Sequence, residues 1–306
     1  MGDDMFRNVK NEAQRFVDKW AEEHRYQIQD VKFTMYLWRR SRLSLVGSGI
    51  VVALIVVSLL APHLPLYDPF ELNVQNRLLP PSWEHLCGTD QLGRDILTRM
   101  INGSRISLMI GAMVVTIASL IGLVLGLVSG YFGRKIDEAI MRLTDMFFAF
   151  PRLVLAMAVA AALGPGINNT MLAIAVVSWP IYARLARAGA LQVKNEIYVE
   201  AAKSIGAGHM RTLFLHILPM ILHLIIVQAT LDMGGVILEA AGLSFIGLGA
   251  QPPSPEWGLM VSEGRHYIHM NWWVSTLPGV AIVITALGFN LLGDGLRDIF
   301  DVRTRR

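Results

Sequence analysis

Three polar residues stand within one long apolar stretch in the C-terminal third of the chain. Gln228, Asp232 and Glu239 are separated by four and seven residues, so they share one face of a helix. Ionisable side chains inside an apolar helix rarely face lipid. We expect this face either to line a path, where it meets a cation or an amine, or to form a buried hydrogen-bond network between helices.

Two further opposite charges, Asp145 and Arg152, stand seven residues apart in another apolar stretch. Seven residues are close to two helical turns, so both side chains would lie on the same helix face. The spacing predicts that they form an ion pair with a structural role.

The sequence gives weak support for metal or covalent chemistry. His63, His85, Cys87, His266 and His269 lie in hydrophilic segments, and imidazole with thiolate suits late first-row metals such as nickel. Their spacing fixes no coordination geometry, so we expect no metal site and ordinary hydrogen-bonded or exposed histidines. The single cysteine excludes an internal disulfide and a CxxC site. Because a G-x-x-x-x-G-K-[S/T] phosphate loop is also missing, we expect no catalytic residue and no cofactor on this chain.

Six apolar stretches must position these residues. Of the 306 residues, 53% are hydrophobic and only 17% charged, and the mean hydropathy is +0.46. A bilayer core of about 30 Å requires about 20 apolar helical residues. Runs near that length cover 43–61, 106–130, 143–163, 167–182, 218–238 and 274–292, the fourth being short with Pro180 near its end. The sequence therefore predicts an all-α integral membrane protein with six transmembrane helices within 43–293.

Positive charge is shared unevenly between the two sides of such a protein. Of the 27 Lys and Arg residues, 21 lie before the first run, in 131–142, in 184–217 or after the sixth run, and five lie in the opposite loops. The positive-inside rule then predicts cytoplasmic termini for a multi-pass protein of the cell inner (plasma) membrane. The predicted cytoplasmic parts are 1–42, 188–217 and 294–306, and the predicted external loops are 62–105 and 241–273.

The N-terminal tail is too charged to be a signal peptide. Its apolar residues recur at helical spacing and predict an amphipathic helix that lies on lipid headgroups or docks on a partner: Phe6, Val9, Ala13, Phe16, Val17 and Trp20. Tyr36, Trp38, Arg39, Arg40 and Arg42 then form an interfacial anchor.

The cytoplasmic loop 188–217 contains a pattern with a mechanical interpretation. Glu200, Ala201 and Ala202 are followed by Gly206 and then by Leu218-Pro219. A short helix, a glycine turn and a second helix make a compact knob that can fit a cleft on another protein and move rigidly with it. Glu200 supplies a charged contact, the alanines permit close helix approach, and Pro219 marks the start of the fifth span.

This spacing resembles the cytoplasmic "EAA" signature of the permeases of binding-protein-dependent ABC importers. Further matches extend over 80–302: GTDQLGRD at 88–95, AFP at 149–151, QPPSPEWG at 251–258 and LLGDGLRD at 291–298. Together they are similar to the second, C-type permease of the dipeptide, oligopeptide and nickel uptake family. Two departures are His216, where the general pattern has isoleucine, and the long N-terminal tail.

The resemblance implies the type I ABC importer permease fold and a set of partners. These are a second permease subunit that completes a heterodimer, two cytoplasmic subunits that bind ATP and Mg, an external solute-binding protein, and the lipid bilayer. Nucleic acid is not among them. The coupling contacts would be Glu200, Ala201, Ala202, Gly206, Leu218 and Pro219, and the external gate or binding-protein contacts would be Asp90, Arg94, Asp95, Pro252, Pro253 and Trp257.

Three function classes remain open from the sequence. The first is a transport pathway for dipeptides or oligopeptides gated by partner ATPases, or the same machinery importing nickel, glutathione or an oligosaccharide. The second is a membrane enzyme that uses Asp232, Glu239 and histidines. The third is a self-sufficient secondary transporter, in which the intramembrane acids would carry protons.

Overall fold

A computed structural model describes residues 36–64 and 66–304, with side chains to residue 300. Residues 36–40 are helical, and the elements that follow are α3 (Arg42–Leu60), η1 (Ala61–His63), η2 (Val74–Asn76), α4 (Ile96–Phe132), α5 (Arg134–Phe148), α6 (Arg152–Leu163), α7 (Ile167–Val193), α8 (Ile197–Ser204), α9 (His209–Arg211), the π-helical turn η3 (Thr212–Ile217), α10 (Leu218–Ile246), α11 (Trp257–Gly264), η4 (Arg265–Tyr267) and α12 (Trp273–Thr304). The amphipathic helix expected within the tail lies outside the described residues.

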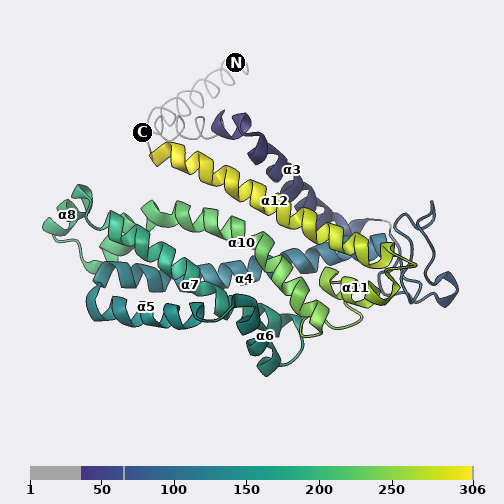
Figure 1. The fold of residues 1–306 in the computed structure, drawn as a ribbon. Helices are drawn as coiled ribbons and strands as arrows, with labels where there is room; N and C mark the ends of the chain where they lie inside the picture. The colour runs from purple at the N-terminus through teal and green to yellow at the C-terminus, as the bar shows by residue number, and fades with distance from the viewer. Residues whose placement is uncertain (1–35, 65, 305–306) are drawn as a thin grey trace, which may run out of the picture.

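Over the described part of the chain, five helical segments are long and apolar enough to cross a membrane, or six when the bent pair α5 and α6 counts as one span. This confirms the all-α membrane architecture (Figure 1). The predicted continuous helix over 143–163 is wrong, because α5 and α6 meet at an angle of 90°. The break falls at Ala149-Phe150-Pro151, where Pro151 lacks an N–H and disfavours helical conformation in the residue before it.

Two other predicted spans differ in length. Helix α4 begins ten residues earlier than expected, at Ile96, because the Asp95 side chain accepts the Thr98 N–H as an N-cap at 2.7 Å. Helix α7 does not end near Pro180 but passes through it to Val193. These longer helices shorten the connecting loops that the sequence predicted.

Helices α4 and α7 form the most extensive helix contact among the described residues. A Cβ atom at Gly122 would lie 2.4 Å from the Tyr182 Cβ, and one at Gly126 would lie 2.3 Å from the Ala183 carbonyl oxygen. The four-residue glycine spacing therefore serves close helix packing.

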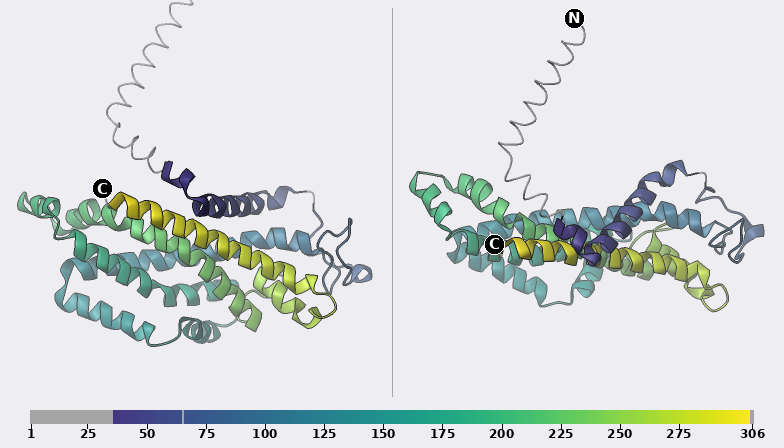
Figure 2. Two further views of the ribbon diagram at one scale, coloured as in Figure 1. Left: turned by 45° about the horizontal axis from the view of Figure 1, so that its top comes forward. Right: turned by 90° about the horizontal axis from the view of Figure 1, so that it is seen from above.

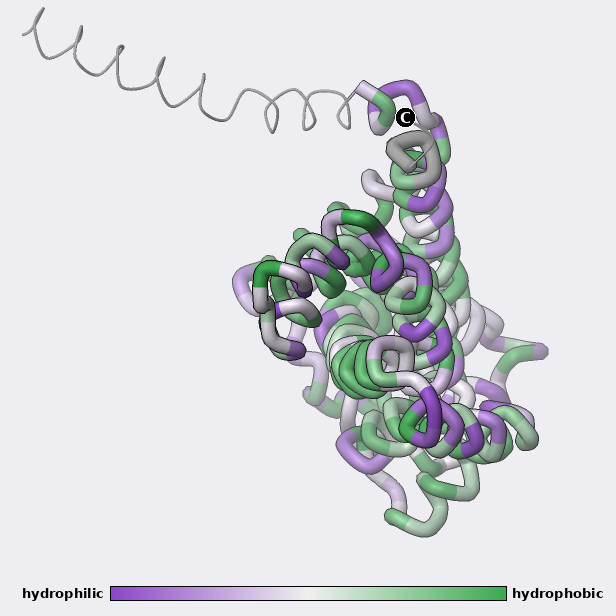
Figure 3. The backbone as a smooth tube through the Cα atoms, turned by 90° about the vertical axis from the view of Figure 1, so that its left-hand side faces the viewer, coloured by the Kyte–Doolittle hydropathy of each residue, from purple (hydrophilic) through white to green (hydrophobic). Residues whose placement is uncertain are grey.

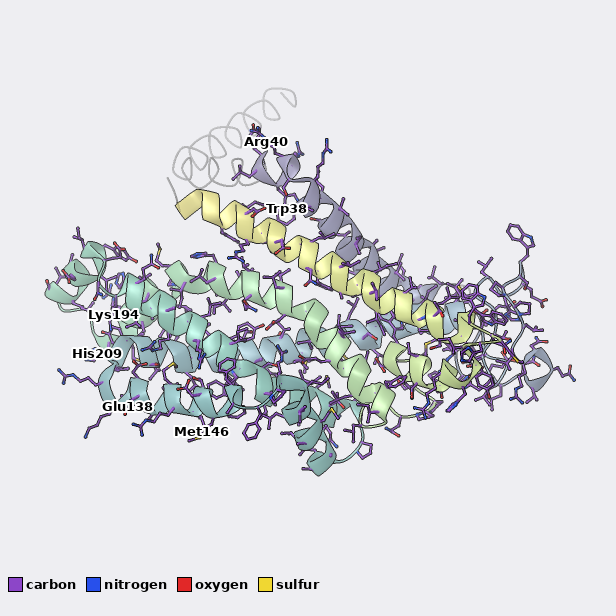
Figure 4. All side chains as sticks on the ribbon, in the orientation of Figure 1. Trp38, Arg40, Glu138, Met146, Lys194 and His209 are labelled. Atoms are coloured by element: carbon purple, nitrogen blue, oxygen red, sulfur yellow. The ribbon has the colours of Figure 1, made fainter. Side chains whose placement is uncertain are left out.

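Helix α3 packs against α12 on one side of the bundle (Figure 1), and seen from above the two helices cross and then diverge (Figure 2, right). Gly47 packs against the backbone of Leu291 and Leu292, and Gly295 against Ser44. Most of the remaining surface of α3 is apolar and exposed, which suits contact with lipid. At the start of this region Trp38 and Arg40 project beside the end of α12, and the Arg40 guanidinium donates to the Tyr36 hydroxyl at 3.3 Å (Figure 4).

The elongated molecule has two distinct ends. Helix α8 lies at one end, called here the α8 end, whereas α11 and the loop that joins α3 to α4 lie at the other, called the α11 end (Figure 1). Seen from the α8 end, hydrophilic and hydrophobic residues alternate along the nearest segments (Figure 3). The predicted C-terminal tail, 294–306, is helical as far as Thr304, because α12 extends to that residue.

Candidate functional site

Charged and polar side chains from three helices meet in the apolar part of the bundle. Arg152 is the first residue of α6, directly after the break, and its Nε lies 3.1 Å from Oε1 of Glu239 on α10. Asp232 lies about two helical turns before Glu239 on α10. Its Oδ1 accepts a hydrogen bond from the Gln228 side-chain amide at 3.2 Å. The second carboxylate oxygen of Asp232 is buried and has no hydrogen-bond partner among the described residues.

Asp232 interacts electrostatically with Glu239 and with the hydroxyl of Tyr182 on α7. The three predicted polar residues of α10 thus face a common region, together with Arg152 and Tyr182. Two carboxylates and one guanidinium give this cluster, called here the intramembrane cluster, a net negative charge when all are ionised. It can accept hydrogen bonds from a cationic or amine group.

The predicted ion pair between Asp145 and Arg152 is wrong. The break between α5 and α6 turns Arg152 toward α10, while Asp145 stays on α5 and pairs with Arg184 of α7. The Arg184 guanidinium also lies over the Phe148 ring, 4.1 Å from its centroid. A helix-periodicity argument fails here because the helix does not continue.

The segment that carries the EAA pattern forms a small helical projection at the α8 end. Val199 and Ala202 are the buried residues of α8, which contacts the π-helical turn η3. The Tyr198 hydroxyl donates to the His216 carbonyl at 3.3 Å. Gly206 then reverses the chain with φ of +91°, a conformation that L-residues with side chains rarely adopt.

Several contacts hold this projection to the membrane helices. The Lys194 ammonium donates to the Gly130 carbonyl at 2.8 Å, and the Tyr131 hydroxyl lies 2.9 Å from Nδ1 of His209. Lys194 and His209 lie together at this end of the molecule (Figure 4). Pro219 lies in the first turn of α10, but the apolar helical segment that could span the membrane begins earlier, at His209, because α9 and η3 run directly into α10.

The outer surface of the projection carries large exposed apolar side chains among charged ones. Ile197 is 84% exposed and Ile205 88%, and Met210, Phe214 and Leu215 are also exposed. Glu200 and Ala201 lie on this exposed side, whereas Ala202 faces the rest of the chain. Large apolar side chains gathered at one exposed tip indicate a surface that a partner covers.

At the α11 end, charged residues of the motif 88–95 form a buried ionic network with Arg99 and Glu263. The Arg94 guanidinium donates to Asp90 Oδ2 at 2.6 Å and to Glu263 Oε2 at 3.1 Å. Arg99 donates to the same Glu263 oxygen at 3.3 Å. This network joins the end of the loop, the first turn of α4, and α11.

The second motif, 251–258, packs against the first turns of α4. Glu256 caps α11 by accepting the N–H groups of Gly258 and Leu259, and burial raises the pKa of its carboxyl group. The Trp257 indole donates to the Met100 carbonyl at 2.9 Å. Pro252 and Pro253 lie exposed just before this capped turn.

Four of the six residues expected at an external gate or contact are therefore buried within this chain: Asp90, Arg94, Asp95 and Trp257. Their burial gives them a structural role in joining the loop to α4 and α11. Of the six, Pro252 and Pro253 are exposed and can contact another protein directly. Sequence reasoning missed Arg99 and Glu263 as members of the network, although Arg99 follows Asp95 at helical spacing.

Within 36–64 and 66–304, no three His, Cys, Asp or Glu side chains are arranged to hold a metal ion. His85 pairs instead with Asp95, at 3.0 Å from Nδ1 to Oδ2, and His266 lies beside Arg265. His85 and His266 thus contact different partners.

Cys87 offers a test of which side of the membrane the α11 end faces. We expect a membrane-impermeant maleimide to label Cys87 from outside intact spheroplasts. Burial and the nearby Asp95 raise the pKa of this thiol, so the thiolate fraction is small at neutral pH and labelling should accelerate as the pH rises. Mass spectrometry of this chain would detect the adduct, with Cys87→Ser as the unlabelled control. Labelling only after the membrane is opened would invert the topology.

Residues 122–306 match the family model described as "Binding-protein-dependent transport system inner membrane component", and residues 35–81 match "N-terminal TM domain of oligopeptide transport permease C". The chain is 48% identical over 267 residues to the probable D,D-dipeptide transport system permease protein DdpC of Escherichia coli (strain K12). That alignment covers 87% of this chain and 90% of the relative. It is 46% identical to the dipeptide transport system permease protein DppC of Alkalihalophilus pseudofirmus, with coverage of 87% and 88%.

Among solved structures, a chain of the MetNI methionine ABC transporter in an inward facing conformation matches with a TM-score of 0.54 and 19% identity, over 68% of this chain and 97% of that chain. This likeness concerns the fold. The family match and the relatives together decide the class: the chain belongs to the family of binding-protein-dependent transport system inner membrane components and is a multi-pass permease subunit of an ABC importer.

Proposed function

We propose that this chain forms half of a membrane pathway for dipeptides or oligopeptides, completed by a second permease subunit. Two cytoplasmic ATPases, which bind ATP and Mg, would drive it, and an external solute-binding protein would deliver the substrate. Both termini and the α8 end would face the cytoplasm. Relatives named as dipeptide permeases support the substrate class.

The observation that carries the proposal is the apolar projection at the α8 end. Ile197, Ile205 and Phe214 are exposed on a segment whose backbone is fixed by the Gly206 turn and by contacts to α4. A rigid knob with an apolar tip can enter a cleft on an ATPase and transmit its movement to α10, which begins directly after η3.

The intramembrane cluster would meet the substrate. A peptide carries an ammonium group at one end and a carboxylate at the other, and the cluster supplies free carboxylate oxygens beside the Arg152 guanidinium. A lone acid would attract cations of every kind. An acid pair next to a guanidinium favours a zwitterion over a simple metal ion.

The test is uptake of a labelled dipeptide by cells that express this chain with its candidate partners. Uptake should stop when either ATPase gene is deleted, and it should also stop when the solute-binding protein is missing. Uptake by this chain alone would instead favour a secondary transporter. Import of labelled glutathione or nickel in place of peptide would show that the substrate differs while the ATP-driven import mechanism is the same.

Substituting Asp232→Asn is expected to lower peptide uptake several-fold while the complex still assembles. The change removes one negative charge but keeps an acceptor for the Gln228 amide, so packing is preserved. Uptake and the yield of purified complex should be measured together. Thr230→Val is the matched control, because the Thr230 hydroxyl bonds only the Ile226 carbonyl of its own helix. A lower yield with normal uptake per complex would assign Asp232 to a structural network instead.

A further inference from the structure

The loop at the α11 end contains a small polar cavity of 220 Å³. Four carboxylate side chains, Asp68, Glu71, Glu84 and Asp95, contribute to its lining together with His85, and none of the lining residues is Lys or Arg. The volume is below the range of about 300–1,000 Å³ that is usual for small-molecule sites. It suits the end of one long side chain.

Several acceptors around this cavity are free. Asp68 accepts the Phe70 N–H, and Asp95 accepts from His85 and from Thr98. The carboxylates of Glu71 and Glu84, by contrast, have no hydrogen bond or ion pair to any described residue.

His85 adds a buried acceptor to the cavity. Its side chain is only 6% exposed, and Nδ1 lies 3.0 Å from Asp95 Oδ2, whereas Nε2 is buried without a partner in the described chain. Nε2 is therefore free for a hydrogen bond, as an acceptor when the ring is neutral with its proton on Nδ1. The unpaired nitrogen and the free carboxylates therefore match a cationic hydrogen-bond donor.

A rigid turn presents an aromatic side chain beside this cavity. The Ser82 N–H donates to the His85 carbonyl at 2.8 Å, and the His85 N–H donates to the Ser82 hydroxyl at 3.1 Å. The Tyr67 hydroxyl also donates to the Glu84 carbonyl at 3.2 Å. Trp83 stands at the tip of this turn and is 97% exposed. A tryptophan held in solvent by a hydrogen-bonded turn, next to a charged pocket, has the features of an interface hot spot.

We propose that Glu71, Trp83, Glu84 and His85, called here the acidic loop surface, dock the external solute-binding protein by receiving one of its Lys or Arg side chains in the cavity. The inference rests on the proposed function, which supplies this partner and places the α11 end outside. Charge complementarity selects the occupant, because carboxylates repel lipid phosphates and other acidic groups. The contact with the solute-binding protein is thus assigned to the loop that precedes 88–95, because the charged residues of that motif are buried.

The test uses the complete transporter in lipid nanodiscs and a purified solute-binding protein that stimulates ATP hydrolysis by the wild type. We expect the double variant Glu71→Gln/Glu84→Gln to raise the Kd for this protein at least about tenfold. Trp83→Ala should weaken binding comparably. Wild-type affinity should also fall as salt rises from about 50 mM to about 500 mM, and the double variant should lose most of that dependence. Glu138→Gln, which removes an exposed carboxylate at the opposite end, is the matched control and should bind as the wild type does.

Two results would overturn the proposal. One is a Kd and a salt dependence that are unchanged in both variants. The other is normal binding per assembled complex with reduced recovery of the second permease subunit, which would assign the acidic loop surface to contact between permeases. If the wild-type transporter fails to bind any solute-binding protein, the proposed function itself fails, so the two failures are distinguishable.

Discussion

Replacing Arg94 by methionine is expected to destabilise the folded permease by about 3–5 kcal/mol, because it leaves two carboxylates of a buried network with one guanidinium between them. Arg94 is 2% exposed and donates to both Asp90 and Glu263. In the intact network two guanidinium groups balance two carboxylates. Without Arg94, Arg99 would face both acids alone, 3.7 Å from Asp90 Oδ2 and 3.3 Å from Glu263 Oε2.

The measurement is the thermal unfolding midpoint and the yield of monodisperse protein after detergent extraction. Arg142→Met is the matched control, since its exposed pair with Glu138 should contribute less than about 1 kcal/mol. The double variant Arg94→Met/Glu263→Gln restores neutrality and should recover part of the loss. Equal stability of Arg94→Met and the control would show that the network does not hold the loop to α4 and α11.

Much of the fold follows from apolar run length and charge bias. The runs around 43–61, 218–238 and 274–292 correspond to α3, α10 and α12, which stay helical across each run although Pro278 lies inside α12. The position of α4 needed a capping argument as well: Asp95 and Thr98 have the spacing of an N-cap pair, which moves the start of the helix to Ile96.

The third span shows why periodicity alone fails. The sequence contains the reason for the break, Pro151, but not its angle, and the bend redirects Arg152 from α5 toward Glu239. Likewise Pro180 marks no helix end, because a proline inside a packed membrane helix is tolerated when neighbouring helices support it. Both outcomes depend on tertiary contacts that a single helix pattern does not contain.

The candidate site was likewise predictable only in part from the sequence. The face shared by Gln228, Asp232 and Glu239 is a property of one helix, so its spacing predicted it. The partners Arg152 and Tyr182 come from two other helices and required the fold. The external motif was recognised as important, but its charged residues looked like surface residues. Their burial depends on Glu263, which lies more than 160 residues away in the chain.

The projection at the α8 end gives the sharpest functional prediction, because two glycines in it differ only in backbone conformation. Gly206 has φ of +91° and Gly208 has φ of –66°, and a Cβ atom at either position would meet nothing within 4 Å. Valine at Gly206 should therefore strain the backbone by about 1–3 kcal/mol although its Cβ meets no neighbouring residue, whereas valine at Gly208 should be tolerated. A shift of about 1.4 kcal/mol would already reduce the population of the native turn about tenfold relative to its alternatives.

If the projection couples ATP hydrolysis to transport, Gly206→Val should lower peptide uptake at least about tenfold while the permease still inserts in the membrane. ATP hydrolysis by the reconstituted complex should then lose its dependence on the solute-binding protein. Gly208→Val should keep both properties, and Ile205→Ser, which removes an exposed apolar side chain without altering the turn, should weaken retention of the ATPase subunits during purification. Uptake by Gly206→Val at the rate of Gly208→Val would show that this turn transmits no movement, and the coupling role would have to pass to another cytoplasmic segment.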